Sequence, residues 1–393
     1  MKILFLSRWF PYPPNNGSKL RIYQLLKGLS HSHETHLLSF CDDPIIDTAA
    51  AHEKRLLSIR TVQWREFNPS SRRAALGFFS LTPRSLVDTY SPQMEQEIRC
   101  ALQEQHFDLI ITSQWQMTAY RHFFSNVPVL MEEIEVGTLH GQLANSDNLQ
   151  TRLRSQLTWL KHKHYLARVL GNNQPCTVVS EQEKELLAGI VPDNQSIYVI
   201  PNGAVLDEAK SFQELPEPGR LIFTGSFRFR PNYEAMVWFL ERVFPLVRAQ
   251  VPGASLTITG DNAGLPLPHS EGVTLTGYVE DVRPLIKQAW ASIVPLHVGG
   301  GTRLKILEAM ALFTPVISTS KGAEGLVLTD GINVEIADTA EEFAARTIRV
   351  LQDEVLRDRL AENAFSLVLS TYDWNVIIPK FLSVVANAPR ATR

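Results

Sequence analysis

The residues best suited to chemistry lie in one glycine-rich stretch, PLHVGGGTRLKILEAMALFTP at 295–315. An apolar run precedes three consecutive glycines, and a helical pattern follows them. Glycine lets a ligand approach the backbone closely, and the free N–H groups at a helix start favour an anion such as a diphosphate. We therefore expect Gly300, Gly301 and Thr302 to contact the donor phosphates, with Thr302 as the N-cap residue.

Two cations and a carboxylate follow the glycines. Arg303 and Lys305 would lie in the first helical turn, where the helix dipole disfavours positive charge. An anionic ligand explains this placement better than stability does, so Arg303→Glu is expected to leave the melting temperature of the ligand-free protein equal or slightly higher. Glu308 lies on nearly the same face as Lys305, and its carboxylate can accept both hydroxyl hydrogens of a ribose. The alternative is a Lys305–Glu308 salt bridge on a surface helix, which leaves the glycines unexplained.

A second basic segment, LIFTGSFRFRPNY at 221–233, again joins a strand end to a loop. Arg228 and Arg230 follow the strand, and we predict that Arg228 in particular contacts phosphate; two solvated arginines are the alternative. Tyr278 follows a later strand, at a position typical of nucleobase contacts through backbone groups. A simple turn explains Tyr278 equally well.

The first half of the chain carries an acidic segment after a predicted strand. Glu132, Glu133 and Glu135 lie together there. One of these carboxylates could orient or deprotonate an acceptor hydroxyl, and Glu135 is the first candidate. The alternative is a solvated acidic loop at a helix N-terminus, where such charges are favoured anyway.

The elements that must position these residues alternate between strand and helix in two runs. A polar, proline-bearing segment at 207–219 separates the runs and is predicted to be a linker. The alternation implies parallel sheets with right-handed crossovers. We therefore predict an α/β fold of two Rossmann-like, doubly wound parallel-sheet domains that face a cleft. They comprise 1–203, with a helix in 375–393 crossing back to this domain, and 204–374, and ligands are expected at the carboxyl ends of the strands.

Composition limits the partners and the compartment. The 393-residue chain has a net charge of −3, so no global basic field indicates nucleic acid. Its three cysteines are widely spaced, which argues against a disulfide framework or a zinc site. No apolar run is long enough to span a membrane, and we expect a cytoplasmic protein. Basic and apolar residues mix at 52–84 and 152–168, which fits either peripheral contact with an anionic inner membrane face or an ordinary helix exterior.

Several segments together resemble the retaining glycosyltransferases of family 4, which have the GT-B fold. The resemblance covers nearly the whole chain. It rests on PPNNGSKLR at 13–21, SEQEKE at 180–185, IPNG at 200–203, FTGSFRFRPN at 223–232, TGYVEDV at 276–282, VPLHVGGGTRLKILEAMA at 294–311, TPVISTSKGAEGL at 314–326 and DGINVEIADTAEEFA at 330–344.

The resemblance implies roles for particular residues. Gly17 matches a loop that reaches over the donor diphosphate, and Arg228 approximately matches a basic phosphate ligand. The family has two glutamates eight positions apart; Glu308 matches the second, whereas the first falls at Gly300. This departure is typical of a subgroup with GGGTRLK, in which an arginine and a lysine, here Arg303 and Lys305, take over contacts to the donor.

The implied reaction moves a sugar from a nucleoside diphosphate sugar to an acceptor hydroxyl with retention, in polysaccharide or glycoconjugate synthesis. The acceptor would be a glycan, a lipid-linked molecule or a small molecule. No cofactor and no metal are expected, because no DxD-type carboxylate pair follows a strand in the second half. A dinucleotide oxidoreductase is disfavoured because the first loop, PYPPNNGSK, lacks GxGxxG. A GT-B epimerase and a non-catalytic nucleotide-sugar-binding protein remain as alternatives.

Overall fold

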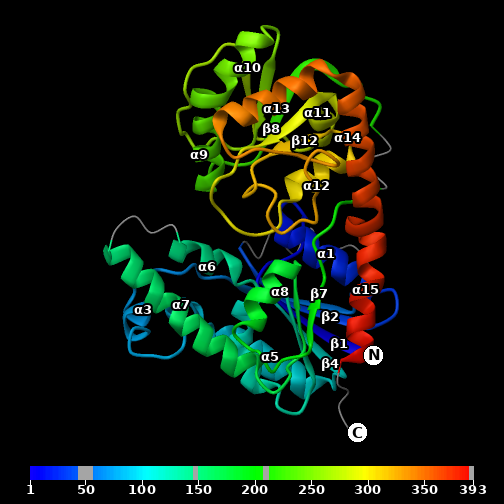
Figure 1. Ribbon diagram of the computed structural model, residues 1–393. Coiled ribbons are helices and arrows are strands. Elements are labelled where there is room, and N and C mark those ends of the chain that lie inside the picture. The colour runs from blue at the N-terminus through cyan, green and yellow to red at the C-terminus, as the bar shows by residue number, and fades with distance from the viewer. Residues whose placement is uncertain (43–55, 145–148, 207–211, 389–393) are drawn as a thin grey trace. The chain divides into compact units, whose positions relative to one another are not determined.

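The computed structural model describes residues 1–42, 56–144, 149–206 and 212–388. The chain divides into two compact units (Figure 1). Unit 1 comprises Met1–Pro201 with Ile378–Arg393, and unit 2 comprises Asn202–Ile377.

Unit 1 is built on a seven-stranded sheet of order β3-β2-β1-β4-β5-β6-β7 in which every pairing is parallel. The order reverses between β1 and β4, and in such sheets ligands bind at the carboxyl ends of the strands beside the reversal. The strands are β1 (Lys2–Ser7), β2 (Glu34–Cys41), β3 (Ser58–Gln63), β4 (Leu109–Ser113), β5 (Val129–Glu132), β6 (Cys176–Val178) and β7 (Ile197–Val199). Its helices are α1 (Gly17–Leu29), α3 (Arg72–Leu76), α4 (Arg84–Thr89), α5 (Pro92–Glu104), the 3-10 helix η1 (Trp115–Phe123), α6 (Gly137–Ala144), α7 (Leu149–Leu170) and α8 (Glu181–Ala188).

Unit 2 has a six-stranded parallel sheet of order β10-β9-β8-β11-β12-β13. Its strands are β8 (Glu217–Thr224), β9 (Ser255–Thr259), β10 (Val273–Gly277), β11 (Ala289–Val294), β12 (Val316–Ser318) and β13 (Glu335–Ile336). Its helices are α9 (Arg230–Trp238), the π-helix η3 (Phe239–Val243), α10 (Phe244–Gln250), α11 (Arg283–Gln288), α12 (Leu304–Ala311), α13 (Ala340–Gln352), α14 (Glu354–Leu367) and the π-helix η4 (Val368–Tyr372).

The last helix, α15 (Trp374–Asn387), begins in unit 2 and continues into unit 1. Within unit 1 it packs against α1 (Figure 1), where a Cβ added at Gly28 would lie 2.4 Å from Cγ2 of Ile378. Glycine at this position is therefore required for the two helices to approach as closely as they do.

The predicted α/β fold of two doubly wound parallel sheets is confirmed, with local differences. The proposed linker 207–219 overlaps β8, which begins at Glu217, and residues 207–211 lie outside the described part of the chain. Three consecutive helical segments, α9, η3 and α10, begin at Arg230 and end at Gln250, with the π-helical turn in the middle.

Candidate active site

Two glycine-containing loops meet at the carboxyl edge of the unit 2 sheet. Gly225 follows β8 and Gly260 follows β9. Gly260 has φ 116°, and a Cβ there would lie 2.6 Å from the carbonyl oxygen of Gly225. Both the backbone angle and the close approach require glycine, so the two loops pack backbone against backbone at this edge.

Lys305 joins the two basic motifs. It lies in the first turn of α12, and its Nζ donates a hydrogen bond to Oδ1 of Asn232 at 3.0 Å. The same atom lies 4.1 Å from the ring centroid of Phe223 and would be 2.8 Å from a Cβ at Gly225. Asn232 and Phe223 belong to the segment around Arg228 but were not among the predicted site residues. Both residues lie in the FTGSFRFRPN motif, and this motif could have identified them as site residues from the sequence.

Burial changes the pKa of two groups in α12. It lowers the pKa of Lys305 to about 7, with the charge of Arg303 acting in the same direction and Glu308 opposing it. It also raises the pKa of Glu308 to about 7, while Arg283 opposes the change more than Lys305 does. An ammonium that is costly to keep charged gains most from an anionic ligand, so Lys305 is suited to contact a diphosphate.

Arg303 has a structural role that the sequence did not indicate. Helix α12 begins at Leu304, so Arg303 is the cap residue and Thr302 lies before it. Arg303 is only 5% exposed, and its guanidinium donates to the carbonyl oxygens of Gly300, at 2.7 Å, and Lys321, at 3.4 Å. The prediction that Thr302 caps the helix is wrong. The hydrogen bonds of Arg303 hold the loop, and the expected effect of Arg303→Glu on the melting temperature stays a prediction.

Thr302 instead links the glycine loop to Asn202. Its hydroxyl accepts a hydrogen bond from Nδ2 of Asn202 at 3.0 Å. Gly301 has φ 80° and is exposed, and Gly300 is half-buried, so the end of the loop remains accessible from outside. The donor-binding roles of these three residues stay predictions.

The remaining predicted residues of unit 2 are more exposed. Arg228 forms an ion pair with Asp261, which partly offsets its charge. Arg230 pairs with Glu234 within α9, at 3.0 Å. Tyr278 follows β10 and is largely exposed. Arg228 and Tyr278 are therefore accessible to a ligand, and their donor-binding roles stay predictions.

In unit 1, Gly17 is the first residue of α1 rather than part of a loop. Asn16 caps this helix, and its side chain accepts a hydrogen bond from the backbone N–H of Lys19 at 3.0 Å. A small residue at the helix start leaves the free N–H groups of the first turn uncovered. Gly17 thus remains a predicted donor contact through the helix N-terminus.

The acidic segment divides into three different environments. Glu132, at the end of β5, is fully buried, and its Oε1 lies 2.6 Å from the guanidinium of Arg21. Glu135 is half-buried beside the start of α6, where it accepts a hydrogen bond from the hydroxyl of Thr138. This matches the expected placement of a carboxylate at a helix N-terminus, and the catalytic role of Glu135 stays a prediction. Glu133 lies between them and has a left-handed backbone, with φ 56°.

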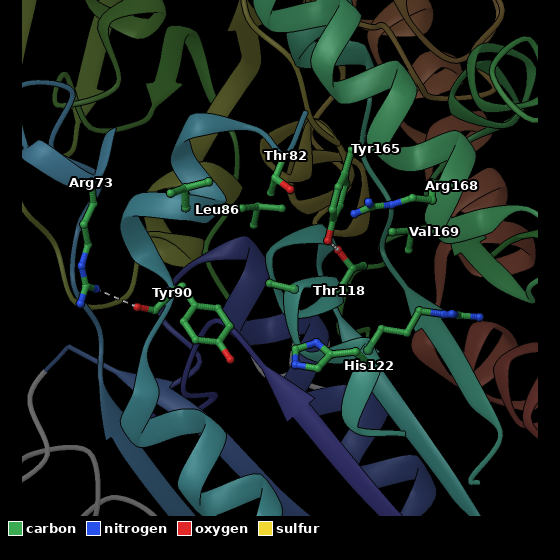
Figure 2. A pocket seen from close by; sticks show the side chains of 12 residues that line it. Arg73, Thr82, Leu86, Tyr90, Thr118, His122, Tyr165, Arg168 and Val169 are labelled. Atoms are coloured by element: carbon green, nitrogen blue, oxygen red, sulfur yellow. Dashed lines mark hydrogen bonds between the residues drawn. The ribbon is translucent and has the colours of Figure 1, made fainter. Parts of the chain in front are cut away.

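Unit 1 also contains a cavity of about 710 Å³ that includes none of the predicted site residues. Figure 2 shows its aromatic and basic lining, in which the hydroxyls of Thr118 and Tyr165 lie 3.0 Å apart and Arg73 donates to the carbonyl oxygen of Tyr90 at 3.3 Å. The cavity is lined by Arg73, Thr82, Leu86, Val87, Tyr90, Thr118, Ala119, Arg121, His122, Tyr165, Arg168 and Val169. It contains arginines and a histidine but no carboxylate.

Across the described residues, no three histidine, cysteine, aspartate or glutamate side chains gather in a way that could hold a metal ion. None of the described helices is both long enough and apolar enough to span a bilayer.

Comparison with known proteins agrees with this geometry. Residues 218–353 match the family described as Glycosyl transferases group 1. An uncharacterized 44.6 kDa protein in the cps region of Klebsiella pneumoniae is 21% identical over 385 residues, covering 95% of this chain and 96% of the relative. The lipopolysaccharide core biosynthesis glycosyltransferase LpsE of Rhizobium meliloti is 29% identical over 153 residues, covering 36% of this chain and 44% of the relative.

Among solved structures, Anabaena Alr3699/HepE in complex with UDP-glucose superposes with a TM-score of 0.65 at 13% identity, covering 98% of this chain and 99% of that one. The chain thus has the GT-B fold of glycosyltransferases, and its second unit contains a glycosyl transferases group 1 domain.

Proposed function

We propose that this protein transfers a sugar from a nucleoside diphosphate sugar to an acceptor hydroxyl, with retention at the anomeric carbon, in polysaccharide or glycoconjugate synthesis. The observation that carries the proposal is the position of Lys305, which brings a cation to the glycine-lined carboxyl edge of unit 2. The match to Glycosyl transferases group 1 lies over the same unit. The relatives named for a cps region and for lipopolysaccharide core synthesis favour a glycan or lipid-linked acceptor.

In this proposal the donor diphosphate contacts Lys305, Arg303 and the α12 N-terminus. Negative charge builds on the diphosphate as the glycosidic bond breaks, and fixed donors stabilise it. These cations replace a metal ion, and no cofactor takes part. Gly17 and Arg228 add donor contacts, and Tyr278 lies near the nucleobase. A carboxylate of the 132–135 segment, Glu135 in the sequence-based assignment, serves the acceptor hydroxyl.

A panel of nucleotide sugars tests the proposal directly. A donor at 100 times its dissociation constant stabilises the protein by about 2.7 kcal/mol, so the correct donor should raise the melting temperature. Transfer of radiolabelled sugar should then follow for that donor. Binding without transfer or hydrolysis would favour the non-catalytic alternative, and conversion to an epimeric nucleotide sugar would favour the epimerase.

Glu308→Ala is expected to weaken the binding of both donor and free nucleoside diphosphate. Losing a charged hydrogen-bond acceptor for the ribose costs roughly 1.5–3 kcal/mol, which is about a tenfold to hundredfold loss of affinity. Isothermal titration calorimetry with UDP and GDP measures the effect. Glu234→Ala, on the exposed side of α9, is the matched control and should keep wild-type affinity. Unchanged affinity in Glu308→Ala would rule out the ribose role.

We also propose peripheral contact between unit 1 and an anionic membrane. Lys161 of α7 donates to the backbone carbonyls of Gly77 and Phe78, at 2.8 and 2.7 Å, so the segment 76–81 is fixed against α7. This arrangement presents Phe79, which is 94% exposed, on a surface with further exposed apolar side chains. They are Leu76, Leu81, Leu153, Leu157 and Leu160. Arginines at 72, 73, 84, 152 and 154 lie in the same segments, as membrane-surface elements require.

Replacing Phe79 and Leu81 together with serine should weaken vesicle binding by roughly a hundredfold to ten-thousandfold, because each buried apolar side chain contributes about 1.5–3 kcal/mol. Co-sedimentation with phosphatidylglycerol vesicles measures the effect, and binding should fall with added salt. Val355→Ser, an equally exposed change on α14 of unit 2, is the control. Equal binding of the wild type and the double variant would show that this surface does not contact lipid.

A further inference from the structure

Two residues at the carboxyl edge of the unit 1 sheet have backbone conformations that non-glycine residues rarely adopt. Gln114, directly after β4, has φ 72°, and Glu133, directly after β5, has φ 56°. The two strands are paired with Ser113 opposite Glu132, and the N–H of Gln114 donates to the carbonyl oxygen of Glu132 at 2.8 Å. Gln114 and Glu133 therefore occupy equivalent positions on neighbouring strands. Strain of this kind persists where the surroundings hold it, and it is concentrated at functional sites.

The side chains of these two residues leave acceptor atoms unsatisfied. Gln114 is 9% exposed, and its Oε1 has no hydrogen-bond partner within the described part of the chain. The same holds for Oε2 of Glu133, which is also buried. Buried polar atoms are nearly always hydrogen-bonded. When Glu133 is ionised, these two neighbouring acceptors lack a donor, which indicates a ligand that supplies hydroxyl hydrogens.

The surrounding groups keep Glu133 able to exchange a proton near neutral pH. Burial raises its pKa to about 8, and the carboxylates of Glu132 and Glu135 act in the same direction. Arg21, from α1, and the side chain of Gln114 oppose this change. Arg21 opposes it more than Gln114 does, although its guanidinium is also paired with Glu132. A catalytic base is most effective when its pKa lies near the working pH.

We infer that Gln114 and Glu133 form a hydroxyl-binding site and that Glu133, rather than Glu135, accepts the proton of the acceptor hydroxyl. The inference rests on the proposed sugar transfer. The acceptor O–H bond breaks and its proton moves to the Glu133 carboxylate. The acceptor oxygen bonds to the anomeric carbon on the same face from which the diphosphate departs, as retention requires, and the bond from that carbon to the diphosphate breaks, with the electron pair leaving on the diphosphate. Glu135 is less available because it already accepts a hydrogen bond from Thr138.

The key variant is Glu133→Gln, which keeps the shape but cannot accept the proton. Transfer should fall by about a hundredfold or more. The assay uses the nucleotide sugar that gives the largest melting shift, with octyl glucoside and water as acceptors. The wild-type kcat/KM should rise with pH up to about 8, as Glu133 ionises, and Glu133→Gln should lose this dependence. UDP and GDP affinity should not change, because no contact to the nucleotide is assigned to Glu133. Glu34→Gln, at the opposite end of β2 in the same sheet, should match the wild type in rate and pH profile.

A ligand-free measurement supports the kinetic one. The folded protein keeps the Glu133 proton up to about pH 8, whereas the unfolded chain loses it near its ordinary value of 4.5. Wild-type stability should therefore fall as pH rises from about 4.5 to 8, and it should fall less in Glu133→Gln. Gln114→Gly removes the strained side chain, so the melting temperature should hold or rise while transfer drops about tenfold.

Other results would overturn the inference. A larger loss of transfer in Glu135→Gln than in Glu133→Gln would return the role to Glu135. If Glu133→Gln keeps the wild-type pH profile, Gln114 and Glu133 have only a structural role. The same conclusion follows if Gln114→Gly lowers the melting temperature and leaves KM unchanged. Either result could occur while the wild type still binds and transfers from a nucleotide sugar, and in that case the proposed function stands. If the wild type binds no nucleotide sugar, the proposed function fails and this inference fails with it.

Discussion

Replacing Lys305 with methionine should lower sugar transfer by about a thousandfold while making the ligand-free protein more stable. The loss is of the size seen when one fixed donor to a developing negative charge is removed. The gain in stability follows because the ammonium lies over the Phe223 ring with one amide oxygen as its partner, and a buried charge of this kind costs free energy. Calorimetric melting and a radiolabel transfer assay measure the two effects.

The stability effect should depend on pH in a defined direction. The unfolded chain holds the Lys305 proton up to about 10.5, but the folded protein holds it only to about 7. The wild type therefore gains stability as pH rises from about 7 to 10.5, and the advantage of Lys305→Met, about 1–2 kcal/mol at pH 6, should shrink over that range. Lys184→Met, at an exposed lysine of α8, is the control and should change neither quantity. A lower melting temperature at pH 6 would show that Lys305 stabilises the fold.

Removing the carboxylate of Glu132 should destabilise unit 1 by about 3–5 kcal/mol, because it leaves the Arg21 guanidinium buried without its charge partner. Both side chains are fully buried, with 2.6 Å between the charged atoms. Ser113 also donates to Glu132, at 2.7 Å, and Arg21 to the carbonyl oxygen of Pro201, at 3.1 Å, so the pair joins α1 to β4, β5 and the end of the unit. Urea unfolding of Glu132→Ala measures the loss.

Two further variants distinguish the loss of the buried Arg21–Glu132 ion pair from the loss of an exposed ion pair. Glu104→Ala, which removes an exposed partner of Arg60, should cost less than about 1 kcal/mol. The double change Arg21→Met with Glu132→Met should recover most of the stability, since it buries no unpaired charge. A cost below about 1 kcal/mol for Glu132→Ala would contradict the structural role.

The sequence by itself determined the class of fold and the location of the donor motifs. Strand and helix alternation is a local property of hydrophobic spacing, so it predicted two doubly wound sheets. The glycines at 299–301 are also a local signal. They indicated a loop whose backbone a ligand can approach, because glycine has no side chain to block it. Elements β3, α3 and α4 were found only in the structure, because each of them is short.

Tertiary structure decided which charges are available for chemistry. Lys305 meets Asn232 from 73 residues away, and Glu132 meets Arg21 from 111 residues away. No local pattern encodes such pairings, because they depend on which strands become neighbours. The three glutamates of the 132–135 segment look alike in sequence, yet the fold buries one in an ion pair and places another at a helix start. It gives Glu133 a left-handed backbone and a buried Oε2 without a hydrogen-bond partner, because only the packing of β4 against β5 determines where each carboxylate points.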